Sequence, residues 1–560
     1  MESGKWRVES GEWRVESRGV IMKRRLAGFL VLLCMIAEAG AGSQPNVIIM
    51  LADDLGWSDV GYHGGDIDTP SLDRLAAEGV QLDRFYTTPI CSPTRAALMT
   101  GRNPIRLGVA YAVILPWDTT GIHPEERFLP EAFLDAGYQT AMVGKWHLGH
   151  AQQTYHPNER GFEHFYGHLH TEVGYFPPFD NQGGTDFQKN GVTIDDQGYE
   201  TFLLADEVSR YIREREKEKP FFIYMPFLAP HTPLEAPEGL VEKYSDINTD
   251  LAPARSFQTD RTRSISKMMM QDSARPMYAA VVDAMDQAIG QVLSTLDEEQ
   301  IADETIVLFF SDNGGAAYSV GGADNAPLRG GKGETFEGGI RVVSVMRWPD
   351  QLEAGGKMDS IMTVMDVFPT LMEAAGISPG SHYPWDGSSM WPAIRGGEKI
   401  PRKDDVFFVS ETPIYGQIMT TIFNEEWKLV QEIEQDQVTI TVTPHLFNIA
   451  EDPNEYVNLA EKHPEVVAEL SQRVIDWRSM YPISGTRSQL VSPPGWRAPL
   501  DWATYPIPLE KLQGETTRGM APTKTIERVL DMQHGERGRL VYGCERKWYV
   551  AGACIKQDME

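Results

Sequence analysis

The stretch NVIIMLADD, residues 46–54, is an apolar run that ends in two aspartates. Its apolar residues are consecutive rather than alternating, which is typical of a strand buried on both faces. Three similar runs follow along the chain: YQTAMVG at residues 138–144, PFFIYMPF at 220–227 and TIVLFF at 305–310. Patterns typical of helices separate them, at residues 71–79, 127–137, 200–219 and 277–300. This alternation predicts an α/β fold with a mostly parallel sheet flanked by helices.

Polar side chains follow each of these runs. Two acidic residues follow the first run, an acid and an amide follow the last, and a lysine and two histidines follow the runs between. Because the ligand crevice of an open parallel sheet lies beyond the carboxyl ends of its strands, we expect these side chains at one rim. They are Asp53, Asp54, Lys145, His147, His231, Asp312 and Asn313.

The acids and the amide indicate a metal site. Asp53, Asp54, Asp312 and Asn313 offer only oxygen donors, which favours Ca²⁺, with Mg²⁺ as the other option, over zinc. The alternative for either pair alone is a helix cap or a turn. Both pairs at strand ends, with basic residues beside them, favour one cation per chain.

A lone cysteine opens a second informative stretch, CSPTRAALMTGR at residues 91–102. From the residues alone, Cys91 is either a buried apolar thiol or a nucleophile paired with a histidine. The Cys-x-Pro-x-Arg spacing favours a third reading, because the stretch resembles the signature of the sulfatase family. Other blocks resemble that family in the expected order, across about residues 44–480. They are ADDLGW (52–57), GKWHLG (144–149), PHTP (230–233), DNGG (312–315) and PLRGGKGETFEGGIR (327–341).

The resemblance implies an alkaline-phosphatase-like fold and a set of roles. The exporting cell oxidises this cysteine to formylglycine before folding, so a formylglycine-generating enzyme is an expected partner. The hydrated aldehyde attacks sulfur and later releases sulfate, and the modified Cys91 joins the four oxygen ligands of the cation. Arg95 orients the nucleophile, and Lys145 and Lys332 bind sulfate oxygens. His147 assists release, and His231 donates a proton to the leaving alcohol.

The predicted activity is that of an arylsulfatase acting on sulfated carbohydrates or aryl sulfates. Within the family, GKWHLG and GGADNAPLRGGK are most similar to the arylsulfatase B type, N-acetylgalactosamine-4-sulfatase. One alternative is a phosphodiesterase or phosphonate monoester hydrolase of the same superfamily. Another is a non-catalytic binder of sulfated glycans.

The net charge and the N-terminal segment limit which partners and which cellular location are expected. The net charge of −29 argues against nucleic-acid binding and against docking on anionic membranes. A basic segment, a short apolar run and Ala39-Gly40-Ala41 predict a cleaved signal peptide rather than a stable membrane anchor. We therefore expect an exported protein, periplasmic or secreted, and the lack of an N-x-S/T sequon points to a bacterial source. Cys544 and Cys554 could pair there.

The predicted organisation has five parts, and translation is expected to begin at Met22. These are an upstream extension (1–21), a signal peptide (22–41), a catalytic domain (44–400), an α+β subdomain with an antiparallel sheet (401–481) and a tail of unassigned structure (482–560).

Overall fold

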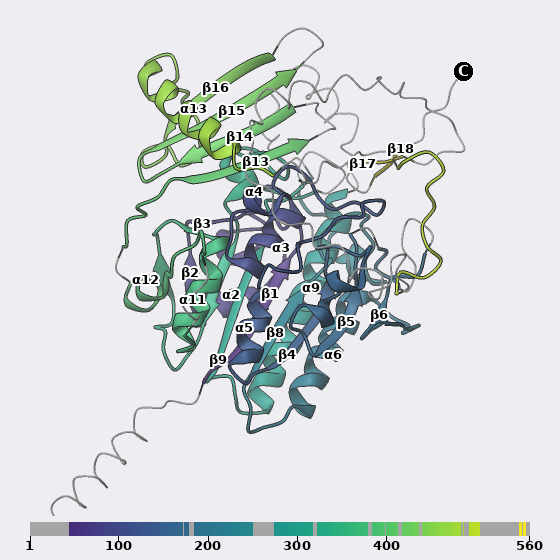
Figure 1. Ribbon diagram of the computed structural model, residues 1–560. Coiled ribbons are helices and arrows are strands. Elements are labelled where there is room, and N and C mark those ends of the chain that lie inside the picture. The colour runs from purple at the N-terminus through teal and green to yellow at the C-terminus, as the bar shows by residue number, and fades with distance from the viewer. Residues whose placement is uncertain are drawn as a thin grey trace, which may run out of the picture. The chain divides into compact units, whose positions relative to one another are not determined.

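The computed structural model describes most of the chain (Figure 1). The described residues are 44–503, with gaps at 172, 178–183, 250–273, 317–321, 379–383, 398, 413–416, 436–439, 483–484 and 486–491, together with strands β17 (Trp548–Val550) and β18 (Ala553–Ile555). The predicted extension, the signal peptide and Cys544 lie outside these residues, so export and the Cys544–Cys554 pair stay predictions. Among the described residues, no helix is both long and apolar enough to cross a bilayer.

The described residues contain a large sheet in the order β11-β2-β10-β9-β1-β8-β4-β5-β6-β7. Its centre is parallel: β9 pairs with β1, β1 with β8, β8 with β4 and β4 with β5. The edges are mixed, because β10 is antiparallel to β9 and β2, and β6 is antiparallel to β5 and β7. The strands are β1 (Asn46–Ala52), β2 (Val80–Leu82), β4 (Gln139–Lys145), β5 (His164–His168), β6 (Gln188–Lys189), β7 (Val192–Thr193), β8 (Phe221–Pro226), β9 (Thr305–Ser311), β10 (Ser344–Arg347) and β11 (Gly356–Met358).

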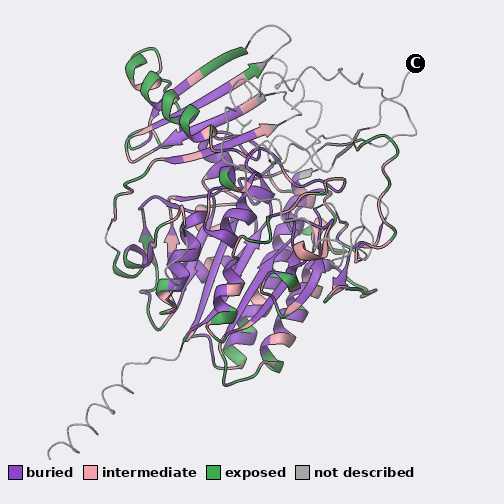
Figure 2. Ribbon diagram, in the orientation of Figure 1, coloured by how far each residue is buried: buried purple, intermediate pink, exposed green. Residues whose placement is uncertain are grey.

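Helices cover both faces of this sheet, as the consecutive apolar runs predict. Alternate residues of β1 enter two different cores: Val47, Ile49 and Leu51 join one, and the residues between them join the other. The first core is completed by α3 (Cys91–Thr100), α5 (Leu129–Asp135), α11 (Val367–Ala374) and α12 (Trp391–Gly396). The second is completed by α2 (Pro70–Glu78), α6 (Glu200–Glu214) and α9 (Ala274–Glu298). Figure 2 shows the central strands buried along their length.

A four-stranded antiparallel sheet follows, as expected after residue 400. Its strands are β13 (Val406–Thr412), β14 (Gln417–Phe423), β15 (Trp427–Gln435) and β16 (Ile440–Asn448), and α13 (Pro464–Arg478) packs on it. The α/β prediction with a second, antiparallel sheet is therefore confirmed. The boundaries assigned to the five parts stay predictions.

Candidate active site

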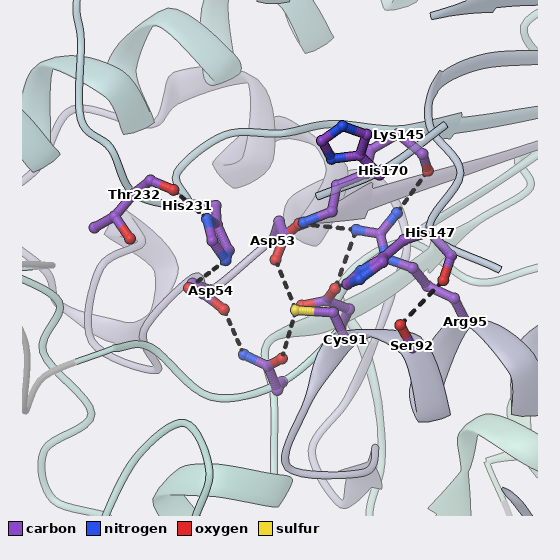
Figure 3. Close-up of polar contacts among 12 residues, drawn as sticks. Asp53, Asp54, Cys91, Ser92, Arg95, Lys145, His147, His170, His231 and Thr232 are labelled. Carbon is purple, nitrogen blue, oxygen red and sulfur yellow. Dashed lines mark hydrogen bonds and ion pairs between the residues drawn. The ribbon is translucent and has the colours of Figure 1, made fainter. Parts of the chain in front are cut away.

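The polar residues of the four apolar runs do meet at one rim, because the runs form adjacent strands, β9-β1-β8-β4. Figure 3 shows their side chains converging near the start of α3. Asp53 and Asp54 follow β1, and Asp312 follows β9 directly. Lys145 is the last residue of β4 rather than the first residue after it, because the strand ends one residue later than the sequence indicated. All of these side chains are buried.

Cys91 is the first residue of α3 and is 1% exposed. Its Sγ donates to Asp53 Oδ1 at 3.3 Å and to Asn313 Oδ1 at 3.5 Å. Burial, reinforced by the negative charges of Asp312 and Asp53, raises the pKa of the thiol well above its usual value. A cysteine nucleophile needs the opposite shift, because the thiolate is the reactive form. The Sγ partners are an acid and an amide rather than a histidine, so the geometry argues against a cysteine–histidine hydrolase acting through the unmodified thiol.

Arg95 lies one helical turn after Cys91 and links the two acidic pairs. Its Nη2 donates to Asp53 Oδ2 at 3.1 Å and to Asp312 Oδ2 at 3.0 Å. Its Nη1 donates to the carbonyl of Lys145 at 2.7 Å. Because the guanidinium is fully buried, it fixes the carboxylates and the end of β4 with little freedom to move. The orienting role expected for Arg95 toward the nucleophile stays a prediction.

Two lysines, expected at the sulfate, each pair with one aspartate. Lys145 Nζ binds Asp53 Oδ2, and Lys332 Nζ binds Asp54 Oδ2 at 2.7 Å. Burial alone would raise the pKa of Asp53, but the positive charges around it, led by Lys145, hold that pKa well below its usual range. The Asp53 carboxylate is therefore charged, and the ammonium groups of the two lysines lie where an anion would also be attracted.

The DNGG turn after β9 packs tightly against the loop that carries Lys332. A Cβ on Gly314 would lie 1.7 Å from the Gly338 carbonyl oxygen, so the DNGG turn packs directly on the loop that carries Lys332. The backbone N–H of Lys332 also donates to the Gly315 carbonyl at 3.2 Å. Close backbone packing is what these glycines allow, and it delivers Lys332 to Asp54.

The two histidines are held differently. His147 has a positive φ of 60°, and its Nε2 lies 3.0 Å from the Ile114 carbonyl. Its Nδ1 is buried and has no hydrogen-bond partner among the described residues. His231 Nε2 lies 3.7 Å from Asp54 Oδ2, and its Nδ1 contacts the Thr232 carbonyl.

Both histidines are neutral near pH 7. Burial, followed by the charge of Lys145, lowers the pKa of His147 well below its usual value. Burial, followed by the charge of Lys332, lowers the pKa of His231 to about 4. A proton-donating role for His231 therefore requires a bound anion, because negative charge raises the pKa of an imidazole.

The acidic cluster fits a divalent cation. The ligand atoms of Asp53, Asp54, Cys91 and His231 all lie within 4.8 Å of one another. Asp312 Oδ1 is buried and has no hydrogen-bond partner among the described residues, although Asp312 Oδ2 binds Arg95. Burial and the neighbouring charge of Asp53 raise the pKa of Asp312. A cation would satisfy this oxygen and remove the repulsion between the two carboxylates. The group differs from the predicted set because it includes His231 and does not include Asp312.

Comparison with known proteins agrees with this geometry. Residues 45–377 match the Sulfatase family, and residues 332–480 match the family described as N-sulphoglucosamine sulphohydrolase, C-terminal. This chain belongs to the sulfatase family. The sulfatase is 31% identical to arylsulfatase J of Mus musculus over 484 residues, which cover 78% of this chain and 76% of that protein. It is therefore a sulfuric ester hydrolase.

Two further similarities support the assignment. N-acetylgalactosamine-6-sulfatase of Homo sapiens is 33% identical over 392 residues, covering 66% of this sulfatase and 69% of that protein. The crystal structure of Ps i-CgsB in complex with k-i-k-neocarrahexaose has a TM-score of 0.67 and 28% identity, and covers 82% of this chain and 95% of that chain.

Buried polar residues at the end of β5 adjoin the site of the sulfatase, and the sequence did not single them out. His168, the last residue of β5, pairs with Lys145 of β4. His168 Nε2 lies 3.8 Å from Glu200 Oε1, and His170 Nε2 lies 3.8 Å from Asp186 Oδ2. All four side chains are buried. The one available signal was that HLHTE follows another apolar strand, as GKWHLG follows β4.

Proposed function

We propose that this sulfatase removes sulfate from carbohydrates, with Cys91 oxidised to formylglycine as its nucleophile. The observation that carries the proposal is the buried, neutral Cys91 thiol at the start of α3, beside Arg95 and two lysines. A thiol with a raised pKa is a poor nucleophile, so this position gains reactivity by modification rather than by ionisation. The hydrated aldehyde supplies two hydroxyls on one carbon, one for attack on sulfur and one for the later release of sulfate.

The residues around Cys91 bind and orient the reacting groups. Arg95 holds Asp53 and Asp312 and fixes the position of residue 91. Lys145 and Lys332 lie at the carboxylates and can extend their ammonium groups to sulfate oxygens, where they stabilise the growing negative charge. The N-terminus of α3 adds the positive end of a helix dipole.

The histidines handle protons. His231 is neutral without substrate, and the negative charge of a bound sulfate ester raises its pKa so that it can protonate the leaving alcohol. His147 carries a buried Nδ1 without a partner, which is available to accept a proton when sulfate is released.

One cation, Ca²⁺ or else Mg²⁺, would be held by Asp53, Asp54, Asp312 and Asn313 together with residue 91. When bound it polarises the nucleophile and a sulfate oxygen. The proposal includes maturation by a formylglycine-generating enzyme and export through residues 22–41, to the periplasm or the medium.

The proposed substrate class is a sulfated carbohydrate, with aryl sulfates as surrogates. N-acetylgalactosamine-6-sulfatase and the carrageenan-oligosaccharide complex are named for glycans, and their similarity supports this class. The finer proposal, drawn from GKWHLG and GGADNAPLRGGK, is activity of the N-acetylgalactosamine-4-sulfatase type.

Matched chromogenic substrates test the reaction class. We expect kcat/KM for 4-nitrophenyl sulfate to exceed that for 4-nitrophenyl phosphate and for a phosphonate monoester. A preference for either phosphorus ester would favour the phosphodiesterase or phosphonate hydrolase alternative. No turnover of any ester, with retained binding of sulfated glycans, would favour the non-catalytic binder. A panel of defined 4-sulfated and 6-sulfated oligosaccharides then tests the substrate.

A further inference from the structure

A cavity lies beside the reaction centre, in a region to which no role has been assigned. It has a volume of about 310 Å³, at the small end of the range for ligand pockets. Its walls include three tryptophans, with an arginine, a histidine and a threonine between them. These are Trp117, Thr119, His150, Trp496, Arg497 and Trp502.

A short loop connects this cavity to the reaction centre. Ser92 follows Cys91, and its Oγ accepts a hydrogen bond from the Ile114 backbone N–H at 3.1 Å. The Ile114 carbonyl contacts His147 Nε2. Two residues further on, the Pro116 carbonyl lies 3.1 Å from His150 Nε2, and Trp117 lines the cavity. The cavity wall therefore begins within a few residues of the groups that surround Cys91.

The opposite wall comes from the part of the tail that the structure describes. Trp502 packs on His170, with ring centroids 4.2 Å apart, and on His150 at 5.2 Å. The backbone N–H groups of Thr185 and Trp502 donate to the carbonyls of Leu500 and Thr185, respectively, which holds this segment against the catalytic unit. His170 comes two residues after His168, which pairs with Lys145 across strands β4 and β5. The tail thus closes the cavity close to the strand end that carries Lys145.

The lining indicates the chemistry of the ligand. Trp117 and Trp496 are half-buried, with centroids 5.7 Å apart and planes at 76°, so both indoles retain accessible surface. The C–H face of a sugar ring packs well on an indole, while Thr119 and Asp118 can bind its hydroxyls. Arg497 is exposed and offers a planar donor pair for a sulfate or carboxylate group.

We propose that this cavity is a subsite for the sugar next to the one that carries the scissile sulfate. The inference rests on the proposed function and deepens it, because it assigns preference for an oligosaccharide over a monosaccharide. Residues 496–502 thereby become part of the specificity of the enzyme.

Competition against 4-nitrophenyl sulfate hydrolysis tests the subsite. The probes are k-i-k-neocarrahexaose and a chondroitin 4-sulfate hexasaccharide, each compared with its own sulfated monosaccharide. In the unsubstituted enzyme we expect at least one hexasaccharide to bind about ten-fold more tightly than its monosaccharide. Trp117→Ala and Trp496→Ala should each remove most of this advantage, with KM for 4-nitrophenyl sulfate unchanged within about two-fold.

The matched control is Trp427→Ala, which truncates a half-buried tryptophan of the antiparallel sheet and should keep the advantage. The proposal is overturned if neither hexasaccharide binds better than its monosaccharide, or if both cavity variants keep the difference. Absence of 4-nitrophenyl sulfate turnover would count against the proposed function instead. Direct calorimetric titration with the same oligosaccharides would then still decide whether the cavity binds sugar.

Discussion

Among the buried groups of carboxylates and basic side chains in the described part of this sulfatase, two clusters differ in how completely they are paired. One surrounds Cys91. The other joins α10 (Glu337–Ile340) to the antiparallel sheet, where Lys428 Nζ lies 2.7 Å from Glu337 Oε1 and 2.8 Å from Glu455 Oε1. The remaining oxygens of these glutamates accept from the Tyr86 hydroxyl at 3.1 Å and from the Glu337 N–H at 2.8 Å.

The cluster at Cys91 is left incomplete by comparison. Asp312 Oδ1 and His147 Nδ1 are buried without hydrogen-bond partners among the described residues. Both residues contact the first turns of α3, Asp312 through Arg95 and His147 through Ser92. Backbone strain does not separate the two clusters, because Asp54 and Glu455 both have positive φ angles. Glu455 Oε1 meets Lys428 at ion-pair distance although it accepts no hydrogen bond, and single buried atoms without partners occur elsewhere among the described residues, as at the Tyr138 hydroxyl. Unmet bonding capacity therefore indicates a ligand site where several such atoms converge beside buried carboxylates, as they do around Cys91.

The largest expected effect is on activity, at the incomplete cluster. Cys91→Ala removes the proposed nucleophile and should lower kcat for 4-nitrophenyl sulfate by roughly 10⁴-fold or more. Its free energy of unfolding should change little, because the thiol makes only two weak hydrogen bonds. Kinetics and urea denaturation of the same preparation measure both. Retained turnover would refute the assignment of Cys91.

The next effect is on stability, at the complete cluster. Lys428→Met leaves Glu337 and Glu455 buried without their shared cation, and should cost about 3–5 kcal/mol of unfolding free energy. Urea denaturation measures this, with the exposed Lys462→Met as control. A loss below about 1 kcal/mol would mean that this cluster is not structural, and the comparison between the two would fail.

Metal binding should stabilise the protein through the incomplete cluster. After EDTA treatment, adding Ca²⁺ or Mg²⁺ at 100 times its Kd should raise the unfolding free energy by about 2.7 kcal/mol. The thermal midpoint measures this independently of activity, and Asp312→Asn should weaken the response because Asp312 is a proposed ligand. Recovery with Zn²⁺ alone would contradict the oxygen-ligand assignment and revive the phosphatase alternative.

A smaller effect concerns Glu200, a buried carboxyl beside His168 that belongs to neither cluster. Burial raises its pKa to about 8, so it binds a proton in the folded state at neutral pH. The unfolded chain loses that proton above about pH 4.3, so this group makes the protein less stable as pH rises toward 8. Glu200→Gln should remove the dependence and gain at least about 1 kcal/mol relative to the unsubstituted protein between pH 5 and pH 8. Urea midpoints at both pH values measure it. A constant difference would show that the carboxyl titrates normally.

The fold and the reaction centre could largely be predicted because both follow from local sequence. Consecutive apolar residues at 46–51 and 305–310 identify buried strands, and parallel pairing brings the residues that follow them together. Pairings between distant residues could not be predicted. Thr185 and Leu500 are 315 positions apart, and Lys428 and Glu337 are 91 positions apart. The local sequence around one residue of such a pair does not indicate which distant residue it contacts. The neutral state of His231 likewise depends on burial, which spacing does not reveal.

The most direct test of the account is the mass of the peptide that carries residue 91, taken from enzyme that turns over 4-nitrophenyl sulfate. We predict a peptide about 18 Da lighter than the cysteine form, because an aldehyde replaces the thiol, and an activity that scales with the modified fraction. Full activity in a preparation whose residue 91 is entirely unmodified cysteine would contradict it.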